Sequence, residues 1–300
     1  MIKIGIGLNS ISYSPEAYAY SNFLESRGYE IQLDNENKLD PNNELNIYFM
    51  GIRPFWKRER GRALEIHEYQ SLSTPPYSKF KDGLKGVINK KPAGRIFLNN
   101  NVKNNLNFRD RVSSLLRDMG VDDALFQKTK LYPEYDVLYC GSIAGRAGLI
   151  EELSRLARMG LKLLIVGDVA KDTEIQLKKI GKIDFTGRVQ RNELPELYRN
   201  AKAGLNYTPD IFPFNIQTST KTLEYLASGM KLISNKYEWS EVFTRKHEIP
   251  VLWTEDCVSL KVFQCHLENN ERIDMSMYEW DSVLKGCKLE RFIVNCLDNS

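Results

Sequence analysis

The sequence predicts an α/β protein with two doubly wound, Rossmann-like domains, each a parallel sheet covered by helices. Its 300 residues exceed the length of one ordinary compact domain and are enough for two hydrophobic cores. Short apolar runs alternate with helical segments, which is typical of strand, helix, strand units with parallel strands. With 42% hydrophobic and 27% charged residues, the composition is that of a globular protein and not of a disordered chain.

The first half contains the less regular of the two patterns. Apolar runs predict strands at 2–8, 29–33, 45–50, 63–67 and 95–98, and helices are expected at 15–27, 77–91 and 107–119. The strand at 63–67 would place His67 at its carboxyl end, where open α/β sheets hold functional groups. A purely structural histidine is the other interpretation. The polar stretch 128–136, which contains Pro133, is the expected linker between a domain at 1–130 and one at 135–275.

The second half alternates more cleanly. Strands are expected at 137–141, 161–166, 183–185, 204–207, 230–234 and 249–253, and helices at 148–158, 171–179, 193–201 and 218–229. Because ligands of such sheets bind beyond the carboxyl ends of the strands, four loops are candidates for a site. They lie at 141–148, 167–168, 186–189 and 208–221.

The segment 218–229, TSTKTLEYLASG, is the strongest of these candidates. Any of the hydroxyl residues Thr218, Ser219 and Thr220 could cap a helix, whose free amides would suit a phosphate. Lys221 adds a positive charge, and Glu224 lies one turn further along the helix. An ordinary capped amphipathic helix is the alternative.

The other loops are ambiguous when each is taken alone. Arg146 could bind a phosphate in two contacts, or it could be a solvated loop residue. Gly141 and Gly167 would allow a close approach of the backbone, whereas Arg188 and Val189 could either hold a flat base or form a simple turn.

Charge is uneven along the chain, although the net charge is only +3. Lys and Arg far outnumber Asp and Glu between residues 53 and 117, and the segment 53–62, RPFWKRERGR, places two aromatic residues among cations. This segment favours either a contact with an anionic membrane surface or a solvated basic loop. A nucleic-acid-binding module is disfavoured, because no RNP, KH or helix-turn-helix pattern accompanies the charge.

The cysteines and the start of the chain exclude other classes. The five cysteines lack CxxC spacing and the three histidines do not cluster near them, so neither a zinc site nor a disulfide framework is expected. The first residues, MIKIGIGLNS, favour a strand and turn over a signal peptide, and no apolar run is long enough for a membrane span. We therefore expect a cytoplasmic protein.

Four linked motifs resemble the donor-binding half of a retaining GT-B glycosyltransferase of group 1. They are DVLYCGSI, LKLLIVGD, IDFTGRV followed by ELPELYRNAKAGLNYTP, and TSTKTLEYLASGMKLIS, and together they cover roughly residues 135–241. The segment EIHEY at 65–69 resembles the acceptor-side histidine segment of the same family. The resemblance implies two Rossmann-like domains facing across a cleft, a small N-terminal acceptor domain, and a C-terminal segment, 276–300, that packs back onto it.

The resemblance also implies roles for residues at matching positions. Arg146, Lys221, Glu224 and His67 would be catalytic: the two cations would neutralise the donor diphosphate, Glu224 would accept hydrogen bonds from the ribose, and His67 would contact the sugar or the acceptor hydroxyl. The donor would be held by a wider set of residues: Gly7, Gly141, Ser142, Gly167, Arg188, Val189, Thr218, Ser219 and Thr220. A nucleotide diphosphate sugar would be the substrate, with no metal or other cofactor.

Several positions depart from the family pattern. Ile216 stands where many relatives carry a glutamate that meets the donor sugar, Ser142 stands where an arginine is frequent, and Arg146-Ala147 replaces a usual Lys-Gly pair. The expected function is transfer of a sugar to a glycan or lipid-linked glycan in bacterial surface polysaccharide, lipopolysaccharide or other glycoconjugate assembly. The expected place is the cytoplasm or the inner face of the membrane. The alternative is a nucleotide-binding GT-B-like protein without transferase activity.

Overall fold

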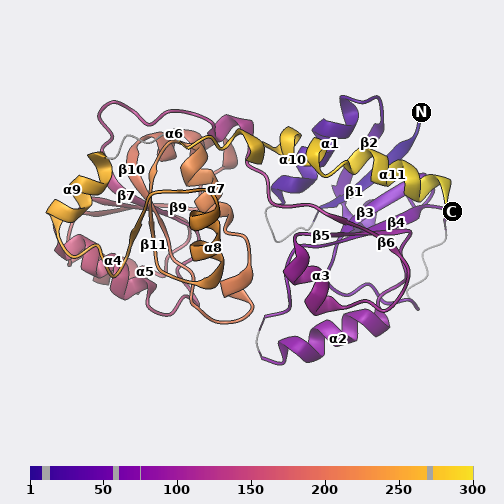
Figure 1. The fold of residues 1–300 in the computed structure, drawn as a ribbon, viewed down its shortest axis with the longest axis horizontal. Helices are drawn as coiled ribbons and strands as arrows, with labels where there is room; N and C mark the ends of the chain where they lie inside the picture. The colour runs from indigo at the N-terminus through magenta and orange to yellow at the C-terminus, as the bar shows by residue number, and fades with distance from the viewer. Residues whose placement is uncertain (9–13, 57–60, 75, 269–272, 300) are drawn as a thin grey trace. The chain divides into compact units, whose positions relative to one another are not determined.

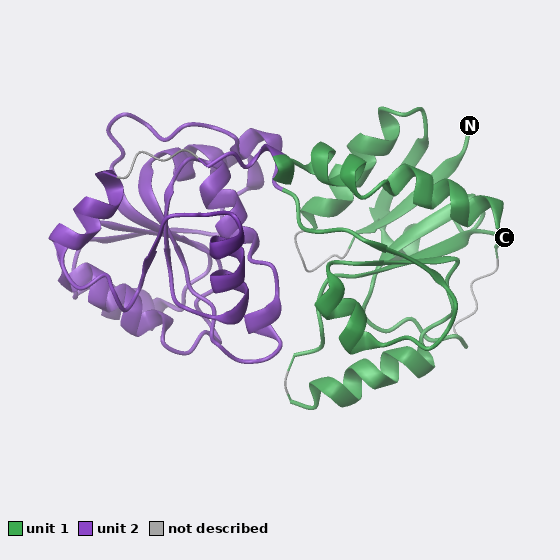
Figure 2. Cartoon of the chain, viewed as in Figure 1, with its two compact units in different colours: residues 1–120, 277–300 green, residues 121–276 purple. Residues whose placement is uncertain are grey.

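The protein forms two compact units, each built on its own sheet. The structure, a computed structural model, describes residues 1–8, 14–56, 61–74, 76–268 and 273–299. Unit 1 comprises Met1–Gly120 and Met277–Ser300, and unit 2 comprises Val121–Ser276 (Figure 2). Within the described residues, each unit has a parallel sheet of six strands, which confirms the predicted α/β class with two Rossmann-like domains.

Unit 1 has the strand order β2-β1-β3-β4-β5-β6. The strands are β1 (Lys3–Leu8), β2 (Glu30–Asn35), β3 (Leu45–Phe49), β4 (Leu64–Tyr69), β5 (Gly94–Phe97) and β6 (Ser113–Leu116). One face is covered by α1 (Pro15–Glu25), α10 (Trp280–Gly286) and α11 (Leu289–Asp298), and the other by α2 (Ser78–Ile88) and α3 (Asn100–Leu106) (Figure 1). The apolar core lies under α1, α10 and α11.

Unit 2 has the strand order β12-β11-β10-β7-β8-β9. The strands are β7 (Tyr135–Cys140), β8 (Leu163–Val166), β9 (Ile183–Gly187), β10 (Ala201–Asn206), β11 (Lys231–Ser234) and β12 (Val251–Trp253). The helices are α4 (Leu149–Arg158), α5 (Lys171–Lys178), α6 (Leu194–Arg199), α7 (Thr220–Ala227), α8 (Glu238–Lys246) and α9 (Leu260–Glu268).

The core of unit 2 follows from the periodicity of its helices. Leu149, Leu153 and Leu156 of α4 recur every three or four residues and are buried in a single cluster with β7, β8 and β10. Leu177 of α5 and Phe263 of α9 join the same cluster. The helices α6 and α7 contact β10, and this is the side that carries the polar groups of the site.

The expected helix at 107–119 is wrong. The chain instead forms α3 at Asn100–Leu106 and then β6, which pairs in parallel with β5. The Asn99 side chain accepts a hydrogen bond from the amide of Val102 at 2.9 Å, so the asparagine run begins a helix. Asn107 ends that helix with a φ of +43°, a conformation that asparagine tolerates.

Other boundaries also differ from the predicted ones. Residues 121–130 belong to unit 2, because Ser228 Oγ donates to the Leu125 carbonyl at 3.0 Å and the Lys130 amide donates to the Arg199 carbonyl at 2.8 Å. The helix expected at 193–201 ends at Arg199, and Ala201 already begins β10. The helices α8 and α9 were not predicted. The last segment forms two helices that separate at Lys288, whose φ is +62°.

Candidate active site

The candidate site lies where the strand order of unit 2 reverses. From β7 the sheet continues to β8 and β9 on one side and to β10 on the other, so β7 and β10 flank the switch point. In open α/β sheets this is where ligands bind, beyond the carboxyl ends of the strands. The residues that follow β7 and β10 meet there with the start of α7.

A cavity of about 200 Å³ occupies this position. Its lining includes two cations, Arg146 and Lys221, and otherwise neutral groups. The lining residues are Arg146, Asn206, Thr208, Phe214, Gln217, Thr218, Ser219, Thr220 and Lys221. The structure therefore brings together five predicted site residues: Arg146, Thr218, Ser219, Thr220 and Lys221.

Among the three hydroxyl candidates, Ser219 caps α7. Its side chain accepts a hydrogen bond from the amide of Thr222 at 3.3 Å. In turn, Ser219 Oγ donates to Asn206 Oδ1 at 2.9 Å, and Asn206 Nδ2 donates to Ser234 Oγ and the Tyr237 hydroxyl, each at 2.9 Å. This network fixes the helix start to the ends of β10 and β11, beside the cavity.

Asn206 was not predicted as a site residue. It is 1% exposed, so an unpaired amide there would destabilise the fold. The sequence does contain a feature that could have identified it. Asn206 is a polar residue near the carboxyl end of the strand predicted at 204–207, which is otherwise apolar.

Lys221 runs alongside Gly141. A Cβ at Gly141 would lie 2.8 Å from Lys221 Cε, so a larger residue there would displace the lysine. Nζ donates to the Tyr139 hydroxyl at 3.1 Å, and Tyr139 donates to the Ser142 carbonyl at 2.9 Å. Burial and then the Arg146 charge lower the pKa of Lys221 to about 7. A bound diphosphate would favour the charged lysine.

Arg146 reaches the same cavity from the loop after β7. One terminal nitrogen, Nη1, donates to the Tyr207 carbonyl at 3.2 Å, which holds the side chain across from β10. The guanidinium also interacts with the Tyr139 hydroxyl, and its planar arrangement of donors matches a phosphate.

Glu224 lies one turn behind the cavity and does not line it. Its Oε2 accepts a hydrogen bond from the Tyr198 hydroxyl at 3.0 Å. Burial raises the pKa of Glu224 to about 7, and the Tyr198 hydrogen bond and the Arg191 charge oppose this shift.

The remaining donor candidates lie at different places. Gly167 packs on Gly141, with the position of its missing Cβ 2.7 Å from the Gly141 oxygen. Arg188 is exposed and Val189 half-buried after β9, and neither lines the cavity. Gly7 is buried within β1 of unit 1, next to Glu36, and so belongs to the other unit.

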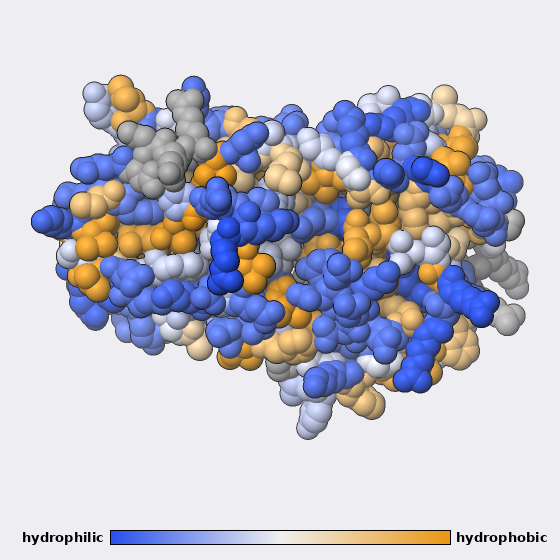
Figure 3. All heavy atoms as spheres, in the orientation of Figure 1, coloured by the Kyte–Doolittle hydropathy of each residue, from blue (hydrophilic) through white to orange (hydrophobic). Residues whose placement is uncertain are grey.

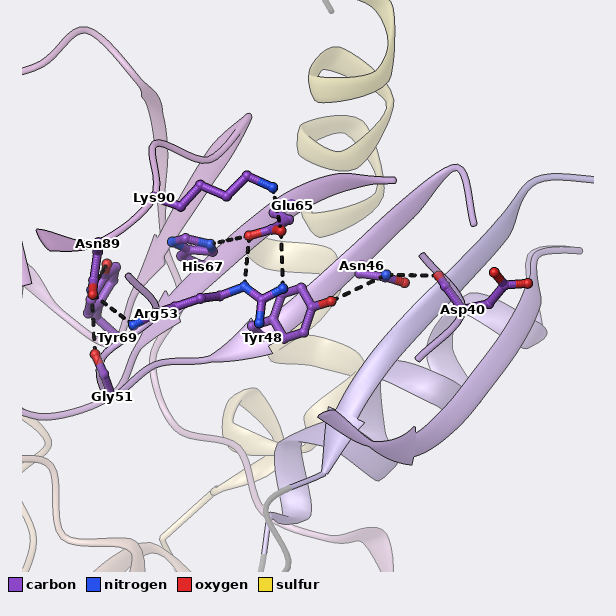
Figure 4. A network of polar contacts seen from close by, with 10 residues as sticks. All are labelled: Asp40, Asn46, Tyr48, Gly51, Arg53, Glu65, His67, Tyr69, Asn89 and Lys90. Carbon is purple, nitrogen blue, oxygen red and sulfur yellow. Dashed lines mark hydrogen bonds and ion pairs between the residues drawn. The ribbon is translucent and has the colours of Figure 1, made fainter. Parts of the chain in front are cut away.

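His67 belongs to a charged cluster in unit 1, shown in Figure 4. Glu65 and His67 lie two residues apart on β4 and so share one face of the sheet. His67 Nε2 lies 2.9 Å from Glu65 Oε2, Arg53 makes two contacts with the same carboxylate at 3.0 and 3.1 Å, and Lys90 Nζ lies 2.7 Å from it. Burial raises the pKa of Glu65, but hydrogen bonds from His67, Arg53 and Lys90 outweigh it and hold this pKa well below its usual range.

The predicted place of His67 is wrong. The strand β4 continues to Tyr69, so His67 lies within the strand and is 0% exposed. Burial lowers the pKa of the imidazole, which favours the neutral ring. In this position the ring contacts Glu65, as the structural interpretation expects.

Two features are absent from the part of the chain that the structure describes. There, no three His, Cys, Asp or Glu side chains gather in a way that could hold a metal ion. Within the same residues, no helix combines the length and the apolar character that a membrane crossing requires.

Known proteins show a match at the level of family and fold. A family model described as glycosyl transferase-like matches residues 146–296, just over half of the chain. No protein among the curated sequences compared matches the chain.

Three solved structures illustrate the fold. AviGT4, a glycosyltransferase involved in avilamycin A biosynthesis, has a TM-score of 0.64 and 11% identity, with 99% of this chain and 98% of AviGT4 covered. HepE of Anabaena, in complex with UDP and glucose, has a TM-score of 0.60 and 10% identity, with 100% of both chains covered. WaaG, a glycosyltransferase involved in lipopolysaccharide biosynthesis, has a TM-score of 0.60 and 11% identity, again with 100% of both chains covered.

These likenesses extend over nearly the whole chain, and the predicted GT-B fold is confirmed by them. The family match covers most of unit 2, including Arg146, the cavity and α7, together with most of the last segment, which belongs to unit 1. The chain therefore belongs to the glycosyl transferase-like family.

Proposed function

We propose that the protein transfers a sugar from a nucleotide diphosphate sugar to a hydroxyl acceptor, with retention at the anomeric carbon. The observation that carries this proposal is the cavity at the switch point of unit 2, where Arg146, Lys221 and the capped start of α7 converge. Retention rests on the likeness of the four sequence motifs to retaining enzymes.

The charge of the cavity suits the departing diphosphate. When the bond between sugar and phosphate breaks, negative charge grows on the phosphate oxygens. Arg146, a protonated Lys221 and the α7 amides would stabilise that charge more in the transition state than in the ground state. The same groups would replace a divalent metal ion, so we propose that activity needs none.

Other predicted residues complete the donor site in this proposal. Glu224, held by Tyr198, would accept hydrogen bonds from ribose hydroxyls after a small rotation toward the cavity. Arg188 and Val189, which follow β9, would contact the base. Gly141, Ser142 and Gly167 would contact the phosphates through their backbone, and the absence of a side chain at Gly141 allows Lys221 to lie beside it.

The proposed acceptor is a glycan or a lipid-linked glycan in surface polysaccharide, lipopolysaccharide or other glycoconjugate assembly, at the cytoplasmic face of a membrane. The uneven positive charge of unit 1 supports an anionic surface as its neighbour. The expected contact of segment 53–62 with that surface belongs to this proposal, and residues 57–60 of it lie outside the described residues.

A second candidate is a protein that binds nucleotide sugars without transferring them. Ile216, on the short helix Phe214–Ile216 beside the cavity, supports it, because an aliphatic side chain replaces the carboxylate expected to meet the sugar. The buried position of His67 points the same way.

Mass spectrometry of the full chain incubated with UDP-, GDP- and ADP-sugars and a mixture of hydroxyl acceptors separates the two candidates. Transfer predicts a glycosylated acceptor or free sugar together with the nucleoside diphosphate, unaffected by EDTA and lost in Lys221→Ala. Binding of a donor, shown by a thermal shift, with no turnover of any donor would favour the second candidate. NMR of the product's anomeric proton tests retention.

A further inference from the structure

The helix α2 of unit 1 buries charged side chains and exposes apolar ones, which is the reverse of an ordinary surface helix. It buries its ion pair, with Asp82 5% exposed, Lys85 8% exposed, and Lys85 Nζ 3.1 Å from Asp82 Oδ1. The Asp82 carboxylate also accepts hydrogen bonds from the Ser73 amide at 3.0 and 3.2 Å. The helix is therefore anchored to its own unit by polar contacts.

The outer face of α2 is apolar instead. Tyr77, at the helix start, is 79% exposed, Phe80 is 71% exposed and Val87 is 76% exposed. The spacings of three and seven residues place these side chains along one face. A single exposed apolar residue needs no explanation, but a row along a helix marks an interaction surface.

Two more exposed aromatic residues lie in the segment next to the carboxyl end of α2. The Phe55 amide donates to the Ile88 carbonyl at 2.9 Å, and the Lys90 amide donates to the Arg53 carbonyl at 2.8 Å, so the segment before Trp56 lies against the carboxyl end of the helix. Phe55 and Trp56 are 59% and 61% exposed, with ring centroids 5.0 Å apart. We call Phe55, Trp56, Tyr77, Phe80 and Val87 the α2 surface.

Positive charge surrounds the α2 surface. Lys79 and Lys91 are exposed, Lys81 is half-buried, and Asp82, the acidic residue of α2, is turned inward and paired. Figure 3 shows hydrophobic side chains among strongly hydrophilic ones along the lower edge of the view, over α2. Lysine stems and aromatic rings between them are the combination that binds the head-group region of an anionic bilayer.

The backbone of α2 fits the same role. Gly83 and Gly86 are exposed, and a Cβ added at either would meet no atom within 4 Å. The helix therefore has no bulky side chain at these two positions, and a flat surface could approach it closely there.

We propose that the α2 surface docks unit 1 onto an anionic lipid bilayer, with α2 lying in the plane of the head groups. Charge complementarity favours an anionic bilayer as the partner. The lysines match its anionic head groups, and the row of aromatic and aliphatic side chains that they border matches the acyl chains beneath. This inference rests on the proposed function for its purpose: the docked protein would take its hydroxyl acceptor from lipid-linked molecules at that surface.

Vesicle co-sedimentation of the full chain tests the proposal without any donor or acceptor. The wild type should bind vesicles that contain phosphatidylglycerol, bind phosphatidylcholine vesicles more weakly, and lose binding as sodium chloride is raised. The double variant Phe80→Ser/Val87→Ser should bind on the order of tenfold more weakly, because two apolar side chains no longer enter the interface. Lys79→Glu should weaken binding to the anionic vesicles alone.

A matched variant controls for the loss of exposed apolar residues. Val242 and Val258 of unit 2 are 56% and 69% exposed, so Val242→Ser/Val258→Ser should bind vesicles as the wild type does. Equal binding by wild type and Phe80→Ser/Val87→Ser would overturn the proposal, as would absence of vesicle binding. A concentration-dependent dimer that this variant abolishes, with no vesicle binding, would assign the surface to a second copy instead.

Calorimetry with nucleoside diphosphates on the same preparations keeps this proposal apart from the proposed function. Phe80→Ser/Val87→Ser should bind a nucleoside diphosphate as the wild type does, because the cavity lies in unit 2. Vesicle binding without nucleotide binding would support the membrane role of the α2 surface and refute the donor site. Nucleotide binding without vesicle binding would refute the membrane role alone.

Discussion

Lys221 and Glu224 lie within one turn of α7, and their pKa values are shifted in opposite directions. Burial disfavours the charged form of both, so it lowers the pKa of the lysine to about 7 and raises the pKa of the glutamate to about 7. Near neutral pH this pair therefore contributes little net charge, and a phosphate ligand would favour the charged lysine.

The affinity for a nucleoside diphosphate should fall as pH rises from 7 to 9. The diphosphate is already largely ionised at pH 7 and gains only a little negative charge toward pH 9, whereas a Lys221 with a pKa of about 7 loses its proton and must regain it on binding. We expect a several-fold loss, measured by calorimetry at several pH values. Lys221→Met should bind weakly with no such slope, and a wild type without the slope would contradict the assignment.

Glu224→Gln should stabilise the protein above neutral pH. A folded-state pKa raised from 4.5 to about 7 means that the stability associated with this carboxyl is present below pH 4.5 and is lost as pH rises through 7. At pH 8 the glutamine variant should exceed the wild type by on the order of 1–3 kcal/mol, with little difference near pH 4.5. Urea unfolding at both pH values measures this, and a variant less stable than wild type at pH 8 would contradict it.

At the scale of elements, local sequence was sufficient where strands were apolar and bounded by glycine. This holds for the strands β7 and β8. It also holds for the helices α4 and α7, and the sequence of α7 contains both its hydroxyl cap and its final glycine. It failed at residues 99–116, because no helix was predicted in the asparagine run although Asn99 caps one. The pairing of β6 with β5 depends on a distant segment, which local periodicity does not report.

The candidate site was predictable to a similar degree. Arg146 and residues 218–221 meet in one cavity because all follow strands that end at the same sheet edge. The contacts of Asn206, Tyr139 and Glu65 could not be predicted, since each joins residues that are remote in sequence. The place of His67 was missed because β4 is two residues longer than its apolar pattern indicated.

Gly83→Ala should stabilise α2. A Cβ at Gly83 meets no atom within 4 Å, and alanine lowers the conformational entropy of the unfolded chain, so we expect a gain of about 0.5–1 kcal/mol. Gly204→Ala is the contrast, because its Cβ would lie 2.3 Å from the Tyr225 ring and should destabilise unit 2. Thermal unfolding of both variants measures this, and a destabilised Gly83→Ala would show that the glycine serves another purpose.

At the scale of the whole molecule, a buried ion pair within the first chain segment of unit 1 contacts the second segment. Glu68 on β4 and Arg117 after β6 are both 0% exposed and paired, and the Tyr20 hydroxyl of α1 donates to Glu68 at 2.6 Å. The guanidinium of Arg117 also lies 5.2 Å from the ring of Trp280 on α10. The contact between Arg117 and Trp280 thus links the polar pair of the first segment to the apolar core that the second segment helps to form.

Removing one partner of this pair should leave the other charge buried and alone. We expect Glu68→Ala to lower the free energy of unfolding by about 3–5 kcal/mol. Glu174→Ala, which breaks the surface pair with Lys178, should lower it by less than about 1 kcal/mol. Urea unfolding followed by tryptophan fluorescence compares them, and similar small effects would refute a structural role for the buried pair.

The central claim is that the cavity of unit 2 binds the diphosphate of a nucleotide sugar. Isothermal titration of the full chain with UDP, GDP and ADP tests it most directly. We predict that at least one of them binds, and that Arg146→Ala and Lys221→Ala each weaken this binding by about tenfold or more, because each removes a charged hydrogen bond to phosphate. Lys178→Ala, far from the cavity lining, should bind as the wild type does. Binding of none of the three, or undiminished binding in both cavity variants, would contradict the account.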